Sequence, residues 1–564
     1  MNKELISGGE ALLRSLKNEN VDTIFGYPGG SIIPVFDSLY DYKEDFRQIL
    51  VRHEQAAIHA AQGYARSSGK VGVSIVTSGP GATNTLTGIS DAMLDSTPIV
   101  VIAGQVSSAV LGTDAFQEID LVGITQPITK WSYQIRRAED VAWAVSRAFY
   151  IASTGRPGPV VLDFTKNAQV SKVLYEPEKV DYVRSYIPYP TPDMEAIKEA
   201  ADLINRAKRP FVLVGQGVEL GNAHKELIDF IEKANLPAAR TLLGLSALPS
   251  DHPLCMGMLG MHGNLGPNVN TNECDVLIAV GMRFSDRVTG NMDTYAKQAK
   301  IIHLDVDKVE IDKNIAIDIP VVGDCKETLP LITALLKEAD RQEWIARFAE
   351  YDAIEKVKVI DKAIAPTEGP VLMGEVARKV SEATDHRAIL VTDVGQNQMF
   401  AARYFKYKEP HSIITSGGLG TMGFGLPAAM GATMGRPDRT VCLFAGDGGF
   451  QMNMQELGTI MEHKCPVKMV VLDNNYLGMV RQWQELFYDN RCSWTPMCNP
   501  NFCKLAEAYG IPTRFVKDRS ELDAAIQEML STDGPFLLNV AVRNEDNVFP
   551  MMPLGASVCD MIFE

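Results

Sequence analysis

Residues 441–480, VCLFAGDGGFQMNMQELGTIMEHKCPVKMVVLDNNYLGMV, constrain the fold more than any other stretch of the chain. The apolar run 441–445, ended by Gly446, predicts a buried strand, and the apolar run 467–472 predicts a second one. Between the two runs, four apolar residues have the spacing of one helix face: Met454, Leu457, Ile460 and Met461. Strand, helix and strand in this order predict a parallel βαβ unit and an α/β fold.

Small and polar residues follow both of these predicted strands. The Gly-Asp-Gly-Gly run at 446–449 is predicted to form a turn in which the missing side chains let phosphates approach the backbone. Asn474 and Tyr476 follow the second strand, so they should lie beside Asp447 at the carboxyl edge of the sheet. A carboxylate, an amide and a backbone carbonyl suit Mg²⁺. A tight turn followed by an ordinary Asn-Asn loop is the alternative, but the pairing of the two motifs favours the metal site.

Composition excludes several classes of protein. The net charge is −16 over 564 residues, which argues against a nucleic-acid or anionic-membrane surface. No apolar run reaches the roughly 18 residues of a membrane-spanning helix, and the N-terminus does not resemble a signal peptide. The nine cysteines are scattered and have no zinc-site spacing. We therefore expect a cytoplasmic protein with reduced thiols.

The rest of the chain predicts three domains. Glycine-rich turns, helices and buried strands alternate in the N-terminal third, with strands at 23–25, 71–76, 98–103 and 160–163, and the C-terminal third repeats this pattern. The middle contains further parallel strands at 211–214, 276–280 and 301–304. We predict three doubly wound parallel α/β domains, 1–170, 193–337 and 365–564, joined by charged linkers at 171–192 and 338–362.

Glu54 is the first candidate for catalysis outside the 441–480 stretch. It follows a predicted strand and precedes a helix whose buried face carries Ala57, Ala60, Ala61 and Tyr64. An acidic residue that complements the helix dipole is the alternative interpretation.

The paired motif, Gly-Asp-Gly at 446–448 and Asn-Asn at 474–475, resembles the thiamine-diphosphate-binding motif. Further segments extend the resemblance over almost the whole chain and are similar to the catalytic large subunit of acetohydroxyacid synthase (acetolactate synthase). They are FGYPGG, RHEQAAIHAAQGYAR, GTDAFQE, GRPGPV, GMLGMHG, RFSDRVTGN, TDVGQ, SGGLGTMGFGLPAA and GMVRQWQELF.

This resemblance implies a role for individual residues around thiamine diphosphate. Asp447, Asn474 and the carbonyl of Tyr476 would bind Mg²⁺, which would hold the diphosphate. Met422 would hold the cofactor bent, and Glu54 would hydrogen-bond its aminopyrimidine ring. The full set of positions implied to contact the cofactor is Glu54, Gln398, Met422, Gly446, Asp447, Gly448, Gly449, Asn474 and Met479.

The resemblance also implies residues around the substrate and a second cofactor. Gly30, Phe116, Gln117 and Lys166 would face the reaction centre, and Met479, Val480, Trp483 and Phe487 would form the substrate-side wall. FAD, in a structural role, would be held by Arg156, Gly215, Gly217, His262, Arg283, Asp305 and Asp324. Each of these roles has an alternative. Phe116, Met422 and Phe487 could pack in the core, and Trp483 could simply contact Phe487 on the same helix face. Lys166 could be a solvated loop residue, and Arg283 and Arg287 could form surface ion pairs.

The implied activity is decarboxylation of pyruvate and condensation with a second pyruvate or 2-ketobutyrate, the first common step of branched-chain amino-acid (isoleucine and valine) biosynthesis. A flavin-dependent pyruvate oxidase, a non-oxidative 2-ketoacid decarboxylase and an inactive scaffold are the alternatives. A homodimer or tetramer is implied, with the site across the interface because the first and last domains are not expected to fold onto each other. A regulatory small subunit is a further implied partner. Ser107 and Asn397 depart from the proline and histidine usual in relatives.

Overall fold

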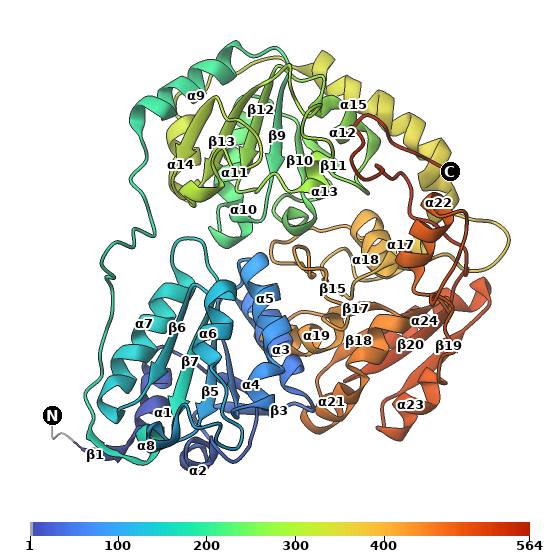
Figure 1. Cartoon of the computed structure of the whole chain (residues 1–564). Coiled ribbons are helices and arrows are strands. Elements are labelled where there is room, and N and C mark those ends of the chain that lie inside the picture. Colours follow the sequence, from blue (N-terminus) through green and yellow to red (C-terminus); the bar gives the residue numbers. More distant parts are fainter. Residues whose placement is uncertain (1–3) are drawn as a thin grey trace.

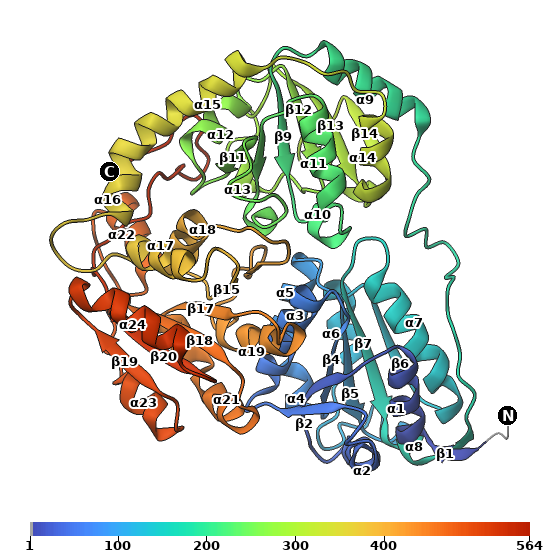
Figure 2. The same cartoon turned by 180° about the vertical axis from the view of Figure 1, so that it is seen from behind.

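Three α/β lobes make up the part of the chain that the computed structural model describes, residues 4–564. Figure 1 shows the N-terminal and C-terminal lobes side by side, with the central lobe above them. Each lobe contains one six-stranded sheet in which all neighbouring strands are parallel. Helices lie on both faces of the sheets (Figure 2). The predicted fold class, three doubly wound α/β units, is confirmed.

The N-terminal sheet has the strand order β3-β2-β4-β5-β7-β6. Its strands are β2 (Thr23–Tyr27), β3 (Arg47–Leu50), β4 (Gly72–Val76), β5 (Ile99–Gln105), β6 (Trp131–Ile135) and β7 (Pro159–Thr165). The helices are α1 (Gly8–Asn18), α2 (Ile33–Asp41), α3 (Glu54–Ser68), α4 (Pro80–Thr83), α5 (Leu86–Leu94), α6 (Leu121–Thr125), α7 (Val141–Ser153) and α8 (Lys166–Val170).

The central sheet has the strand order β11-β10-β9-β12-β13-β14. Its strands are β9 (Pro210–Val214), β10 (Ala238–Arg240), β11 (Cys255–Met258), β12 (Val276–Val280), β13 (Lys300–Asp305) and β14 (Ile319–Val322). The helices are α9 (Met194–Arg206), α10 (Gly217–Leu220), α11 (His224–Lys233), α12 (Leu265–Thr271), α13 (Asp286–Thr289) and α14 (Cys325–Thr333). In order of appearance along the chain this is 3-2-1-4-5-6, the arrangement of dinucleotide-binding sheets.

The C-terminal sheet has the strand order β16-β15-β17-β18-β20-β19. Its strands are β15 (Ile389–Thr392), β16 (Ile413–Ile414), β17 (Val441–Gly446), β18 (Val467–Asp473), β19 (Thr513–Val516) and β20 (Phe536–Ala541). The helices are α17 (Met373–Ala383), α18 (Gln396–Tyr404), α19 (Gly425–Gly435), α20 (Asp447–Met452), α21 (Leu457–His463), α22 (Gly478–Phe487), α23 (Phe502–Ala508) and α24 (Arg519–Ser531). Counted along the chain, this order is identical to that of the N-terminal sheet, as the repeated sequence pattern indicated.

The segments between the lobes differ in structure. Residues 171–192 run along the outside of the molecule (Figure 1), but β8 (Lys172–Leu174) pairs with β1 (Leu5–Ser7) in a small antiparallel sheet. Residues 338–362 are largely helical, with α15 (Gln342–Glu355), a π-helical turn and α16 (Asp361–Ile364). The domain limits of 1–170, 193–337 and 365–564 stay a prediction.

The N-terminal and C-terminal lobes pack together within one chain. Helix α3 lies against α19, as both Figures 1 and 2 show, and the two backbones touch at small residues. A Cβ on Gly63 would lie 1.9 Å from the carbonyl oxygen of Ala428, and one on Gly431 would lie 1.9 Å from that of Ala60. The expectation that these lobes do not fold onto each other was therefore wrong, because their alanine and glycine faces allow close approach.

Two local predictions within residues 441–480 were also wrong. The Gly-Asp-Gly-Gly run is not an isolated turn, since Asp447 begins helix α20 and Gly446 occupies its N-cap position. Met461 does not join the buried face of α21: it is 47% exposed, whereas Leu457 and Ile460 are fully buried. The two strands, β17 and β18, pair in parallel as expected.

Candidate active site

A small cavity of about 50 Å³ lies at the carboxyl edge of the C-terminal sheet. It opens where β15 and β17 are neighbours but lead to helices on opposite sides, the place at which doubly wound sheets bind ligands. Asp447, Asn474 and Tyr476 all line it. The sheet thus brings together the three predicted metal ligands, although they come from two loops.

Asp447 is held in one orientation by three N–H donors. Its carboxylate accepts hydrogen bonds from the backbone N–H of Gly448 (2.9 Å), the backbone N–H of Asn475 (2.7 Å) and the side-chain amide of Asn499 (2.7 Å). Burial raises the pKa of Asp447 to about 6, with the neighbouring Asp473 contributing. A bound cation would favour the ionised carboxylate over the protonated one.

The donor atoms around Asp447 fit Mg²⁺. Asn474 is 2% exposed, and its side-chain nitrogen has no hydrogen-bond partner among the described residues. Its side-chain oxygen accepts the backbone N–H of Tyr476 at 3.1 Å. Oxygen ligands around a partly enclosed niche match the preference of Mg²⁺ for carboxylates, water and phosphate. Sequence reasoning missed Asn499, because nothing in its segment MCNPNF marks it as part of a site.

A second, much larger cavity of about 1020 Å³ adjoins this niche. Residues from all three lobes line it, and it shares five of them with the niche: Val394, Gly395, Met422, Met479 and Val480. The volume is at the upper end for a site that binds a drug-sized ligand. Predicted residues that line it are Arg156, Gly217, His262, Arg283, Asp305, Asp324, Gln398, Met422, Met479 and Trp483.

The central sheet places its switch point beside this cavity. Strands β9 and β12 are neighbours there, and the backbones that follow them approach closely: a Cβ on Gly217 would lie 2.6 Å from the Cα of Gly281. Asp305 ends β13, where a carboxylate can reach a ribose hydroxyl. Gly215 is the exception among the residues predicted to hold FAD, because it packs against Gly281 and does not line the cavity.

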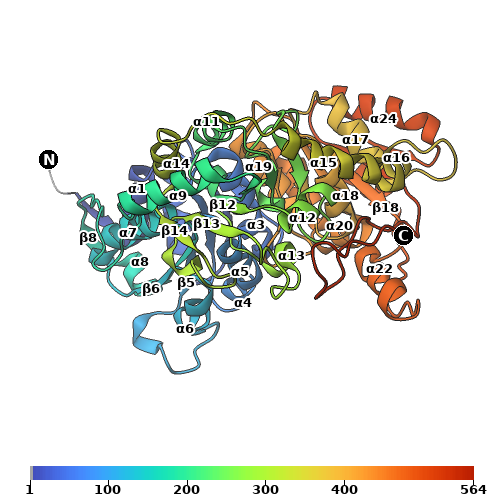
Figure 3. The ribbon, with the colours of Figure 1, turned by 90° about the horizontal axis from the view of Figure 1, so that it is seen from above.

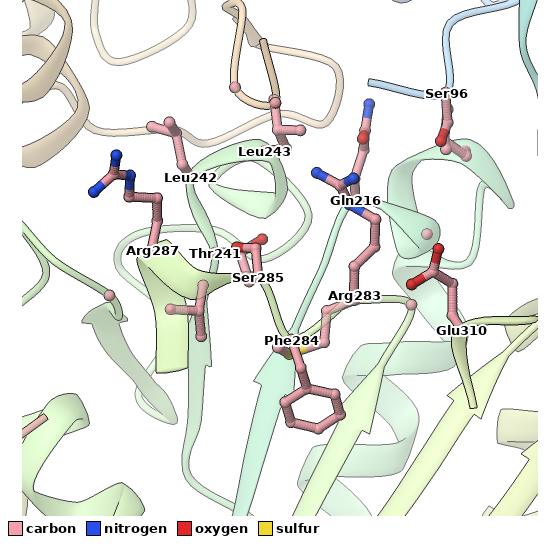
Figure 4. Close-up of a pocket in the computed structure, with 18 of the residues that line it drawn as sticks. Ser96, Gln216, Thr241, Leu242, Leu243, Arg283, Phe284, Ser285, Arg287 and Glu310 are labelled. Atoms are coloured by element: carbon pink, nitrogen blue, oxygen red, sulfur yellow. The ribbon is translucent and has the colours of Figure 1, made fainter. Parts of the chain in front are cut away.

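Charged and titratable side chains on the cavity wall differ in whether they already have an ion-pair partner. Figure 4 shows Arg283 rising beside Gln216, and Arg283 has no ion-pair partner among the described residues. Arg156 instead pairs with Glu310 (2.6 Å) and Asp307 (3.1 Å). Burial lowers the pKa of His262 to about 3, so its ring is neutral.

The other predicted residues of the N-terminal lobe, apart from Arg156, form a separate group at the carboxyl edge of their own sheet. The ammonium of Lys166 donates to the carbonyl of Gly30 at 3.3 Å, and the side chain of Glu54 accepts from Asn84 at 2.9 Å. Gln117 lies against Gly79, whose added Cβ would be 2.9 Å from it, and Phe116 is 88% exposed. None of these residues lines either cavity described above. The exposure of Phe116 argues against its alternative as a core residue.

Helix α22 supplies the apolar wall on one side of the large cavity. Val480 and Trp483 line it, whereas Phe487 packs on Trp483 with ring centres 4.9 Å apart and is 40% exposed. The expectation that all three side chains face one pocket was therefore wrong for Phe487. Figure 3 shows α22 and the segment leading into α6 protruding on the same side of the molecule.

Sequence reasoning also missed buried polar residues that support the two cavities. Asp393 is 1% exposed and accepts N–H groups of Gly423 and Gly425, which fixes the loop that carries Met422. Asn397, one of the two departures, donates to the carbonyls of Asp393 and Phe444. Asn397 therefore connects the end of β15 to β17 beside the niche. Ser107, the other departure, lines neither cavity.

Comparison with known proteins places this geometry in a family. Three models described as thiamine pyrophosphate enzyme domains match the chain: the N-terminal TPP binding domain over 6–124, the central domain over 197–332 and the C-terminal TPP binding domain over 393–540. A probable acetolactate synthase large subunit of Methanocaldococcus jannaschii is 44% identical over 99% of this chain and 95% of its own length. The chain belongs to the acetolactate synthase large subunit family of thiamine pyrophosphate enzymes.

Bacterial members of this family are similar to the chain over the same extent. The acetolactate synthase isozyme 2 large subunit of Escherichia coli is 42% identical and covers 99% of both chains. The large subunit of Lactococcus lactis is 42% identical over 99% of this chain and 96% of its own. The predicted family and the predicted thiamine diphosphate cofactor are confirmed. Among residues 4–564, no helix has the length and apolar composition needed to cross a membrane.

Proposed function

We propose that the chain is the catalytic subunit of an acetolactate synthase, which decarboxylates pyruvate and joins the two-carbon unit to a second 2-ketoacid. The observation that carries this proposal is the oxygen-lined niche of Asp447 and Asn474 opening onto a cavity walled by Met422, Val480 and Trp483. Bound thiamine diphosphate supplies the electron sink for decarboxylation. The chain binds, orients and shields the reacting groups.

Individual residues have separate tasks in this proposal. Asp447, Asn474 and the carbonyl of Tyr476 would hold Mg²⁺, and the N–H groups that begin α20 would face the diphosphate. Met422 would support the cofactor from its loop, while Trp483 would contact the second ketoacid. Glu54 would hold and exchange a proton at the aminopyrimidine ring. FAD would occupy the large cavity, for which the dinucleotide-type strand order and the close Gly217–Gly281 approach are the supporting observations.

A second copy of the chain would complete the site. Glu54, Gly30, Gln117 and Lys166 lie apart from both cavities within one chain, so they would face the niche of a partner in a homodimer or tetramer. A regulatory small subunit is a further proposed partner, since the relatives are named large subunits. The cytoplasmic location stays a prediction.

One assay tests the proposed reaction against its alternatives. The protein is incubated with pyruvate, thiamine diphosphate and Mg²⁺, with and without FAD, while CO₂, acetolactate, acetaldehyde and flavin reduction are measured together. Acetolactate without flavin reduction is expected. Acetaldehyde as the main product would indicate a non-oxidative decarboxylase, and flavin reduction with CO₂ release but without acetolactate would indicate an oxidase. No turnover at all would favour a scaffold.

A further inference from the structure

A cluster of two histidines and one glutamate lies at the junction of the central and C-terminal lobes, outside the cavities of the active site. Glu219 belongs to α10, His224 is the first residue of α11, and His411 lies two residues before β16. One ligand atom from each residue lies within 4.8 Å of the other two. We propose that these three side chains bind a divalent transition-metal ion of the zinc class.

The distances suit a tetrahedral ion. Ligands about 2.1 Å from such an ion lie about 3.4 Å apart. The Nδ1 atom of His411 is 3.3 Å from the Oε2 atom of Glu219, and the Nε2 atom of His224 is 2.9 Å from the same oxygen. The two imidazole rings are 5.3 Å apart and nearly perpendicular, so they converge on the carboxylate without stacking. Small side-chain movements would therefore admit an ion.

His411 contacts Asn222 through one ring nitrogen and faces Glu219 with the other. Its Nε2 atom lies 3.0 Å from the side-chain oxygen of Asn222, an acceptor, and in the neutral tautomer that donates this hydrogen bond the Nδ1 atom is unprotonated. A bare ring nitrogen and a carboxylate oxygen at 3.3 Å repel each other unless a cation lies between them.

Supporting contacts hold the carboxylate in place, as outer partners do in metal sites. Glu219 is 6% exposed, and its other oxygen accepts the hydroxyl of Ser246 at 2.6 Å. Ser246 in turn accepts the backbone N–H of Ser412, beside His411. The side chains of His224 and His411 are 20% and 25% exposed, so water and ions can reach the cluster.

Nearby positive charges are already neutralised. Arg436 forms an ion pair with Asp438 at 2.7 Å, and Arg439 lies 3.6 Å from Glu409. Two imidazoles and one carboxylate, with a fourth position open to water, form a set that zinc accepts and that Mg²⁺ does not prefer. The ion would fasten α10 and α11 to the edge strand β16. Because Gly217 and Leu220 of α10 line the large cavity, it would also fix part of that wall.

Metal titration of the loaded enzyme tests this site. The protein, stripped with a chelator and reloaded with thiamine diphosphate and excess Mg²⁺, is titrated with Co²⁺ while its visible absorption is recorded, and Zn²⁺ is then added in competition. We expect about one Co²⁺ per chain with tetrahedral absorption, displaced by Zn²⁺ and unaffected by Mg²⁺. We also expect Zn²⁺ to raise the unfolding temperature.

Three variants make the result specific. His411→Ala should lose the Co²⁺ absorption and the thermal shift, and Asn222→Leu should bind Co²⁺ about 10- to 100-fold more weakly, the usual effect of removing an outer partner. His252→Gln is the matched control, since His252 contacts a single carboxylate, Glu232, at 3.2 Å in the same lobe. It should behave as wild type. Wild-type protein without Co²⁺ binding, or His411→Ala with unchanged binding, would overturn the proposal.

Discussion

At the scale of single residues, the niche around Asp447 presents oxygen ligands that would suit a cation. Three N–H groups orient the carboxylate, yet burial still raises its pKa to about 6. No Lys or Arg side chain forms an ion pair with Asp447 among the described residues. A bound metal ion would balance this charge.

Replacing Asp447 tests this balance directly. Asp447→Ala should weaken Mg²⁺-dependent binding of thiamine diphosphate by more than about 100-fold, because a direct ligand is lost, whereas Asn499→Ala removes only an orienting partner and should cost about 10- to 100-fold. Titration followed by cofactor-induced circular dichroism measures both affinities. Unchanged binding by Asp447→Ala would show that the metal is held elsewhere.

Trp483 is the residue expected to distinguish the two acceptor ketoacids. It lines the large cavity and packs on Phe487, which fixes its ring. One methylene in an apolar pocket is worth about 1–3 kcal/mol, so wild type should prefer 2-ketobutyrate over pyruvate by at least roughly tenfold, and Trp483→Leu should bring the ratio near one. A competition assay that quantifies both products decides this. Phe487→Leu, which removes only the outer ring, should keep most of the preference.

Individual site residues could be predicted only where a pattern marks them. Asp447 and Asn474 end apolar runs, so their proximity follows from the parallel sheet. Asn499 and Asp393 reach the same region from segments without periodicity or motif, and their contacts exist only after the chain folds. The placement of Phe487 was missed because helical spacing predicts which residues share a face of α22, but it does not predict where along that face the cavity ends.

At the scale of secondary-structure elements, the contact between α3 and α19 joins two lobes through backbone and small side chains. Both helices are almost fully buried, and no large side chain separates them at Gly63 and Gly431. Protein interiors of this density tolerate added atoms poorly.

One added methyl group should disturb this contact. Gly431→Ala would place a Cβ 1.9 Å from the carbonyl oxygen of Ala60, and overpacking of this kind costs about 1–3 kcal/mol of unfolding free energy. Gly266→Ala in α12 is the control, since its Cβ would approach no atom closer than 3.3 Å. Denaturant unfolding measures both. Equal stability of the two variants would mean that the helices do not touch as described.

Glu456 connects the segment before α3 to the C-terminal lobe and gives a pH prediction. It is fully buried and accepts the backbone N–H of Arg52 (2.9 Å) and the hydroxyl of Thr459 (2.7 Å). Burial raises its pKa from 4.5 to about 7. Between these values the folded state holds a proton that the unfolded state has lost, so the free energy of unfolding falls as pH rises.

Glu456→Gln should remove this dependence. The pKa difference corresponds to about 3 kcal/mol, so the variant should gain stability relative to wild type between pH 4.5 and 7, and be the more stable protein at pH 8. Urea unfolding of both proteins across this pH range measures the difference. Parallel pH curves for the two proteins would contradict the assignment.

Strands were the most predictable elements, because parallel strands buried on both faces are continuous apolar runs, as in β12 and β17. Glycine-rich runs were harder to assign, because they can form either a turn or the start of a helix. The Gly-Asp-Gly-Gly run begins α20, where the first N–H groups of the helix remain free to bind a ligand or water.

At the scale of the whole molecule, the succession of three α/β domains along the chain was predictable, but the packing of these domains against one another was not. The repeated pattern in the first and last thirds correctly indicated two similar sheets, and both have the same strand order. Packing of the N-terminal lobe on the C-terminal lobe depends on the match between α3 and α19, which are far apart in sequence. That match cannot be recognised from either helix alone.

Complementation tests whether the site is shared between copies. Glu54→Gln and Asp447→Ala should each be nearly inactive, because the proposed site would use Glu54 from the N-terminal lobe and Asp447 from the C-terminal lobe. If each site uses both lobes from different copies, mixed dimers carry one intact site, and subunit exchange should restore about a quarter of wild-type activity. Acetolactate formation after mixing is the measurement. No recovery would place both residues in a site within one chain.

The distance in sequence between α3 and α19 also has a consequence during synthesis. The ribosome completes α3 at residue 68 and reaches α19 only at residue 425, an interval of about 20 to 70 seconds at the usual rate of translation. During this time the nascent N-terminal lobe can close its own sheet but has no cover for the alanine-rich face of α3. The emerging chain therefore exposes the apolar face of α3, which makes it prone to aggregation. A chaperone that binds small aliphatic side chains would protect this face until translation ends.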